Sequence, residues 1–154
     1  MADRILLWLR RAALVALVVD WALMFGGTHV PIPPENVLNV SDKALHFSGF
    51  WTLSFLLVAV LTLRTGATWR RFALTLAILA AYGAADEWTQ PIVGRDCDFY
   101  DWVADVCGCA GGTLLGLAAV TAVRQTVRKL APHAPPPQGS GKEGDSPQSN
   151  GSGT

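Results

Sequence analysis

Residues 94–116 constrain the fold more than any other stretch, because they combine carboxylates and glycines at helical spacing. From about Asp98 onward the sequence DFYDWVADVCGCAGGTLLG predicts a helix. A glycine at every fourth position lets a second helix backbone approach closely, as in membrane-spanning helices. The alternative is a soluble helix with a polar stripe, in which each glycine costs roughly 1 kcal/mol. Six residues share one face of the predicted helix: Asp98, Asp101, Asp105, Gly108, Gly112 and Gly116.

The chain contains four apolar runs, at about residues 9–26, 47–63, 72–89 and 102–123. Each run is near the length that a bilayer core requires of a helix. The chain has 154 residues, of which 51% are hydrophobic, and its formal net charge is zero. A zero net charge argues against a nucleic-acid-binding surface. We therefore predict an all-α, four-helix transmembrane bundle in a single domain, residues 1–130, with the lipid bilayer as its surroundings.

The tail at residues 131–154 has a different composition. It is rich in Pro, Gly and Ser and has almost no large apolar residue, so it cannot bury a core. We predict a disordered cytoplasmic tail without chemistry. The three cysteines match no zinc-binding spacing, and we interpret Cys97, Cys107 and Cys109 as structural.

The charges are segregated along the chain, and this predicts the orientation. Only Lys43 and Arg95 lie on one side of the predicted bundle, and the positive-inside rule then places both termini in the cytoplasm. The basic residues of the other side are Arg4, Arg10, Arg11, Arg64, Arg70, Arg71, Arg124, Arg128, Lys129 and Lys142. The acids that gather at the extracytoplasmic end are Glu35, Asp42, Asp86, Glu87, Asp96, Asp98, Asp101 and Asp105.

Three segments far apart in sequence are expected to meet at this outer end. The start of the second span supplies Asp42, Lys43 and His46. The end of the third span supplies Asp86, Glu87 and Gln90. The start of the fourth span supplies Arg95, Asp98, Asp101 and Asp105. Two cations and one histidine face eight acids, so some acids are solvated, protonated or paired with a group that the chain does not supply. A divalent cation (Mg, Ca or Mn) is one such group, since carboxylates suit these ions, and a cationic ligand is another. The alternative is an ion-pair lattice that joins the helix ends without any ligand.

Three motifs in these segments resemble those of the VanZ-like membrane proteins, a family named for a protein associated with teicoplanin resistance. DKALHF at residues 42–47 is similar to the family's DKxxHF, and DEWTQ at residues 86–90 to its DExxQ. Gly94-Arg95, Asp101 and ADVCG at residues 104–108 are similar to its GR…D…AN..G pattern. The sequence departs from this pattern in having Asp105 where the family usually has Asn. The resemblance implies a multi-pass protein of the bacterial cytoplasmic membrane, with a link to the cell envelope and to glycopeptide tolerance.

Three hypotheses for function remain open. In the first, the outer site binds or modulates a cell-envelope component, a lipid headgroup or cell-wall precursor. In the second, the protein is a metal-assisted hydrolase or transferase acting on a phosphorylated lipid. In the third, favoured by the intramembrane Asp20, it is a small transporter that works as an oligomer. The sequence does not decide whether the protein is an enzyme, nor its oligomeric state.

The candidate residues receive the following roles. Candidate catalytic residues are His46, Glu87 and Asp86, because an imidazole or carboxylate can move a proton. Candidate ligand-binding residues are Lys43, Arg95, Gln90 and Asp42, with Arg95 suited to phosphate oxygens by its two-pronged geometry. Candidate metal ligands are Asp98, Asp101 and Asp105.

Overall fold

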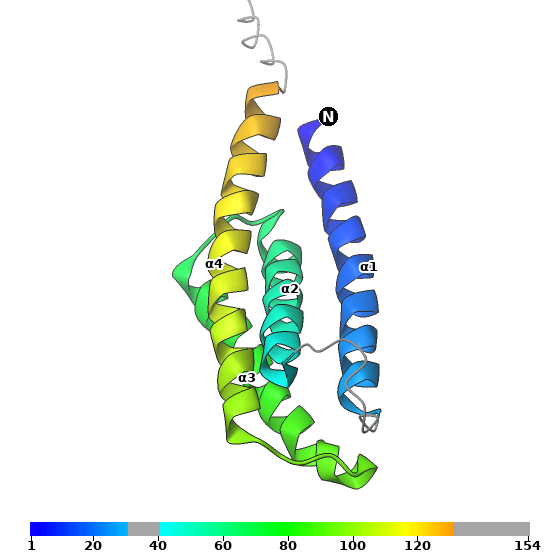
Figure 1. Ribbon diagram of the computed structural model, residues 1–154. Helices are drawn as coiled ribbons and strands as arrows, with labels where there is room; N and C mark the ends of the chain where they lie inside the picture. Colours follow the sequence, from blue (N-terminus) through cyan, green and yellow to red (C-terminus); the bar gives the residue numbers. More distant parts are fainter. Residues whose placement is uncertain (31–40, 131–154) are drawn as a thin grey trace, which may run out of the picture.

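The computed structural model describes residues 1–30 and 41–130, and within these ranges the protein is helical and contains no strand (Figure 1). This confirms the predicted all-α class. The predicted tail at residues 131–154 and the proline-containing connection at residues 31–40 lie outside the described residues. The elements are α1 (Ala2–Thr28), α2 (Asp42–Thr62), α3 (Trp69–Thr89), the 3-10 helix η1 (Gln90–Val93) and α4 (Phe99–Leu130).

Each of the four α-helices begins before the apolar run that predicts it, and α1 and α4 also end after it. The largest difference is in α4, which spans 32 residues against a predicted range of about 102–123. Its last turn contains Arg128 and Lys129, which are good helix formers and interact favourably with the carboxyl end of the helix dipole. At the other end of the bundle, α2 begins with Asp42 in its first turn, where a carboxylate suits the dipole. Charged residues thus continue the helices past the apolar segments.

Helices α2 and α4 run parallel and form the most extensive helix–helix contact in the bundle (Figure 1). Gly108, Gly112 and Gly116 of α4 are all buried against α2. A Cβ atom on Gly108 would collide with the carbonyl oxygen of Phe47, and one on Gly112 with that of Trp51. The glycine face therefore permits the close approach that its spacing predicts, and its partner is α2.

Helices α1 and α3 flank this pair and run in the opposite direction. Near one end of α1 the side chain of Met24 lies against Gly49 of α2, and near the other end Arg10 donates to the carbonyl of Val60 over 3.0 Å. On the α3 side, the Trp102 indole N–H donates to the carbonyl of Ala80 over 3.0 Å. The antiparallel arrangement brings the end of α1 and the end of α3 to the level at which α2 and α4 begin.

Two apolar clusters fill the bundle between its ends. One lies toward the end where α1 begins, and the other lies toward the end where α4 begins. The first contains Leu6, Ala59, Leu63, Val120 and Val127, and the second contains Phe50, Leu53, Leu79 and Cys109.

The charges lie at opposite ends of the bundle. The end where α1 begins and α4 finishes carries the described basic residues other than Lys43 and Arg95 (Figure 1). We call the other end, where α2 and α4 begin, the acidic end. Two helices, Asp42–Thr62 and Phe99–Leu130, are long and apolar enough to cross a membrane.

The glycine contact leads to a prediction for Gly112→Leu. The added side chain would overlap Trp51 O and the Ser54 hydroxyl, so α4 must move away from α2. We expect a loss of at least about 2 kcal/mol of stability, measured as a fall in thermal midpoint in detergent. Ala118→Leu, at an exposed position on the same helix, is the control and should melt like the wild type. Equal midpoints for the two variants would contradict the close packing.

Candidate functional site

The acidic end gathers polar side chains from every helix of the bundle. Because α2 and α4 run parallel, residues spaced four apart on each helix align in two levels. Asp42 of α2 and Asp101 of α4 form the outer level, and His46 and Asp105 form the inner level. His46 belongs to two groups of possible metal ligands, one with Asp42 and Asp101 and one with Asp105 and Glu87 of α3, and in each group one donor atom per residue lies within 4.8 Å of the others. The close helix contact is therefore what brings these side chains together.

The inner level is centred on His46, whose side chain is 2% exposed. Its Nδ1 atom lies 2.9 Å from Asp105 Oδ1 and 3.7 Å from Glu87 Oε1. Asp105 comes from α4 and Glu87 from α3, and both side chains are buried. Gly83 of α3 makes room for the aspartate, since a Cβ atom there would lie 2.9 Å from Asp105 Oδ2. A buried imidazole thus lies between two carboxylates from two other helices.

Gln90 and Asp86 extend the inner level toward α1. The Gln90 amide donates to Glu87 Oε1 over 3.1 Å and to Asp86 Oδ2 over 3.3 Å. The hydroxyl of Thr28 donates to Asp86 Oδ1 over 3.0 Å, so Asp86 is bonded from both sides. We refer to the buried residues His46, Asp86, Glu87, Gln90 and Asp105 as the inner cluster.

The contribution of α1 was missed by the sequence analysis. Its helix continues through Thr28, beyond the predicted end at about residue 26. His29 follows as the cap residue, and its Nε2 atom lies 2.9 Å from the Thr89 hydroxyl. The sequence feature that could have indicated the longer helix is the four-residue spacing of Phe25 and His29, whose ring centroids lie 4.2 Å apart in a stacked arrangement. The glycine pair that precedes Thr28 obscured it.

The outer level consists of ion pairs that are partly exposed. Lys43 Nζ lies 2.7 Å from Asp98 Oδ2 and 3.1 Å from Asp101 Oδ1. Arg95 Nη2 lies 2.7 Å from Asp42 Oδ2, and its Nη1 donates to the Gly27 carbonyl over 3.3 Å. The Lys43 ammonium lowers the pKa of the Asp98 carboxyl, with a smaller contribution from the Tyr100 backbone N–H. These contacts resemble the ion-pair lattice that the sequence left open.

The turn after η1 positions Arg95 at this level. Pro91 lies in the first turn of the 3-10 helix, and Gly94 follows its last residue with a left-handed backbone (φ 79°), a conformation that glycine adopts without strain. The Arg95 amide then donates back to the Gln90 carbonyl over 3.2 Å. The Asp98 amide donates to Glu87 Oε2 over 3.0 Å and so connects the two levels. The GR dipeptide is therefore a turn followed by a guanidinium that binds Asp42 and the Gly27 carbonyl.

The three predicted metal ligands do not form one group in the structure. Asp98 and Asp101 bind Lys43, whereas Asp105 binds His46. The donor groups close enough to share a metal ion within the described ranges both include His46. They are His46 with Glu87 and Asp105, and His46 with Asp42 and Asp101. Spacing along the sequence predicted a metal site made of neighbouring aspartates at the start of α4. The structure instead brings together possible metal ligands from different helices.

The inner cluster contains three carboxyl groups, and the basic groups within ion-pair distance of them in the described chain are two imidazoles, His46 and His29. Asp86, Glu87 and Asp105 are at most 3% exposed, and the lysine and arginine pairs of the described chain involve other acids. Polar atoms are also left over within residues 1–30 and 41–130. Those of the inner cluster that are buried without a hydrogen-bond partner are His46 Nε2, Gln90 Oε1 and Asp105 Oδ2. An ion-pair lattice does not account for this cluster, because buried carboxylates without a counter-charge are costly.

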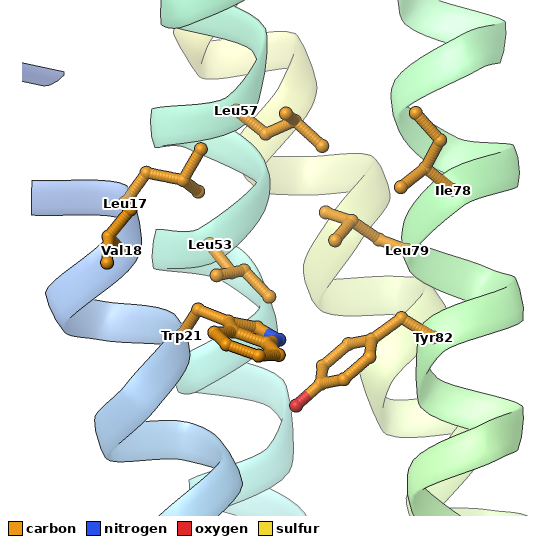
Figure 2. Close-up of a pocket in the computed structure, with 8 residues that line it drawn as sticks. All are labelled: Leu17, Val18, Trp21, Leu53, Leu57, Ile78, Leu79 and Tyr82. Atoms are coloured by element: carbon orange, nitrogen blue, oxygen red, sulfur yellow. The ribbon is translucent and has the colours of Figure 1, made fainter. Parts of the chain in front are cut away.

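Residues of the acidic end line two pockets, and an apolar pocket lies deeper in the bundle. An outer pocket of about 390 Å³ is lined by both ion pairs. A second pocket of about 250 Å³ lies between α1 and α2 and is lined by His46 and Arg95 together with Leu23, Met24 and Leu45. Deeper in the bundle, Figure 2 shows Trp21 and Tyr82 at one end of an apolar pocket of about 310 Å³ between α1, α2 and α3. Polar and apolar space therefore adjoin at the acidic end.

Comparison of the chain with protein-family models, characterised proteins and solved structures found no match.

The bonding of Asp86 yields a prediction about stability. Asp86→Ala removes a buried acceptor that the Thr28 hydroxyl and the Gln90 amide share, although the hydroxyl keeps the carbonyl of Met24 within 3.1 Å, so we expect a loss of roughly 1–3 kcal/mol. Thermal unfolding in detergent measures it. Asp96→Ala is the control, because Asp96 is an exposed carboxylate at the same end of the bundle. A midpoint for Asp86→Ala as high as that of the control would show that Asp86 is not held as described.

Proposed function

We propose that this protein is a VanZ-like integral membrane protein with four spans and both termini in the cytoplasm. The charge segregation between the two ends of the bundle supports this orientation through the positive-inside rule. The exposed surface of the bundle supports the membrane location, since large apolar side chains such as Trp8, Leu23, Ile78 and Leu114 are exposed on α1, α3 and α4. A lipid environment would cover these side chains.

The resemblance to the VanZ-like family gains support from the position of its motifs. The segments DKALHF, DEWTQ and GR are separated by more than 50 residues from first to last, yet their polar residues contact one another at the acidic end. Three motifs that meet in one site are expected to share one function.

The site binds, in this proposal, the anionic headgroup of a lipid or lipid-linked component of the cell envelope. The observation that carries the proposal is the pocket between α1 and α2, which combines Arg95 and His46 with Leu23, Met24 and Leu45. An amphiphilic ligand needs this combination of a polar and an apolar lining. Arg95 and Asp42 line both this pocket and the outer pocket, so a headgroup bound by the guanidinium would be accessible from both.

Topology is tested first. The native Cys97 is exposed at the acidic end. With Cys107 and Cys109 replaced, a membrane-impermeant maleimide added to intact cells should label Cys97. A variant that carries Ala67→Cys as its single thiol, in the turn between α2 and α3, should be labelled after permeabilisation alone. The reverse pattern would place the acidic end in the cytoplasm and contradict the proposed orientation.

Arg95→Lys tests headgroup binding. The substitution keeps the charge but removes the planar fork that binds phosphate or carboxylate oxygens in pairs. We expect it to abolish complementation of the envelope phenotype of a deletion strain, with normal accumulation and thermal midpoint. Arg70→Lys, at the basic end of the bundle, is the matched control and should complement fully. Full complementation by Arg95→Lys would show that Arg95 only braces the helix ends.

A further inference from the structure

Headgroup binding uses His46 but does not explain the buried acids of the inner cluster. Arg95 and Lys43 contact the outer acids, whereas His46, Glu87 and Asp105 lie below them and are fully buried. We propose that these three side chains bind one divalent transition-metal ion, of the zinc or manganese class. This goes beyond the proposed function, because metal binding and headgroup binding can each hold without the other.

The distances within the cluster fit a shared ion. Two donors that are each about 2.1 Å from a metal lie roughly 3.0–3.4 Å apart in octahedral or tetrahedral geometry. The His46 Nδ1 atom lies 2.9 Å from Asp105 Oδ1 and 3.7 Å from Glu87 Oε1, values that lie on either side of this range. The three residues come from three helices, α2, α3 and α4. An ion bound there requires small shifts of the side chains and leaves the helices where they are.

The inner cluster contains polar atoms that the described part of the chain does not satisfy. Asp105 Oδ2, Gln90 Oε1 and His46 Nε2 are buried and have no hydrogen-bond partner there. The His46 imidazole contacts only carboxylates by hydrogen bond or ion pair within the same ranges. A cation offsets the charge of buried carboxylates that are otherwise costly to ionise in low dielectric.

The donor set indicates which ion is suitable. One imidazole nitrogen and two carboxylates suit zinc or manganese better than calcium, which takes six to eight oxygen ligands. The Gln90 amide, which donates to Glu87 Oε1 over 3.1 Å, would hold that carboxylate in orientation. The proton between His46 Nδ1 and Asp105 would leave when the ion binds, because a ligating imidazole is neutral and its donor nitrogen is deprotonated.

The test is titration of Zn²⁺ and Mn²⁺ into the full chain, purified in detergent without a histidine tag and stripped with chelator. Calorimetry should show one site per chain, and metal analysis should show one ion retained after desalting. Glu87→Gln and Asp105→Asn should each weaken binding at least tenfold. Asp98→Asn and Asp101→Asn are matched controls that remove a carboxylate from the outer level, and their affinities should match that of the wild type.

Two results would overturn the proposal. One is the absence of a saturable site in the wild-type protein. The other is loss of binding in the Asp98 or Asp101 variant with retention in Glu87→Gln, which would assign the ion to the outer level. Thermal midpoints of all variants show whether each is folded, and if Asp105→Asn does not accumulate, Glu87→Gln decides the outcome. Arg95→Lys should bind metal normally, so a failure of headgroup binding is distinguished from a failure of this site.

Discussion

The close contact of α2 and α4 across glycines is the constraint on which the rest of the structure depends. Gly108 and Gly112 place the α4 backbone against the carbonyl groups of Phe47 and Trp51. Small residues permit this approach in membrane helices, where packing rather than the hydrophobic effect drives association. The register that results puts Asp105 of α4 beside His46 of α2, with a 2.9 Å contact. The same glycines that tighten the bundle thus determine which acid the imidazole contacts.

The acidic end then separates into two levels that differ in their electrostatics. In the outer level, Lys43 and Arg95 bind the partly exposed carboxylates of Asp98 and Asp42, while the Arg95 side chain itself and Asp101, the second partner of Lys43, are buried. Ion pairs that water reaches contribute little to stability. In the inner level, the carboxylates are buried and have an imidazole and neutral donors as partners. A chain that only needed to join its helix ends could do so with the outer level alone. The inner level is therefore the better indication of a bound ligand.

Much of the fold could be predicted from the sequence. Apolar runs of bilayer length predict helices, and segregated charges predict which helix ends lie together. The helical class follows from these runs, and the polar end follows from the positions of residues 42–46, 86–90 and 95–105. The pairings within that end could not be predicted. Asp42 ion-pairs with Arg95, and the acids nearest to the His46 imidazole, Asp105 and Glu87, come from two other helices. Glycine spacing indicates a close approach, yet it names neither the partner helix nor the register.

Membrane location, family and ligand remain proposals, and the metal site is the most specific of them. Its central claim is that the inner cluster, and not the row of aspartates on α4, holds a divalent ion. The most direct measurement is anomalous diffraction at the zinc absorption edge, from crystals of the full chain grown with zinc. We predict a single peak between His46, Glu87 and Asp105. A peak between Asp98 and Asp101, or no peak at the acidic end, would contradict the account.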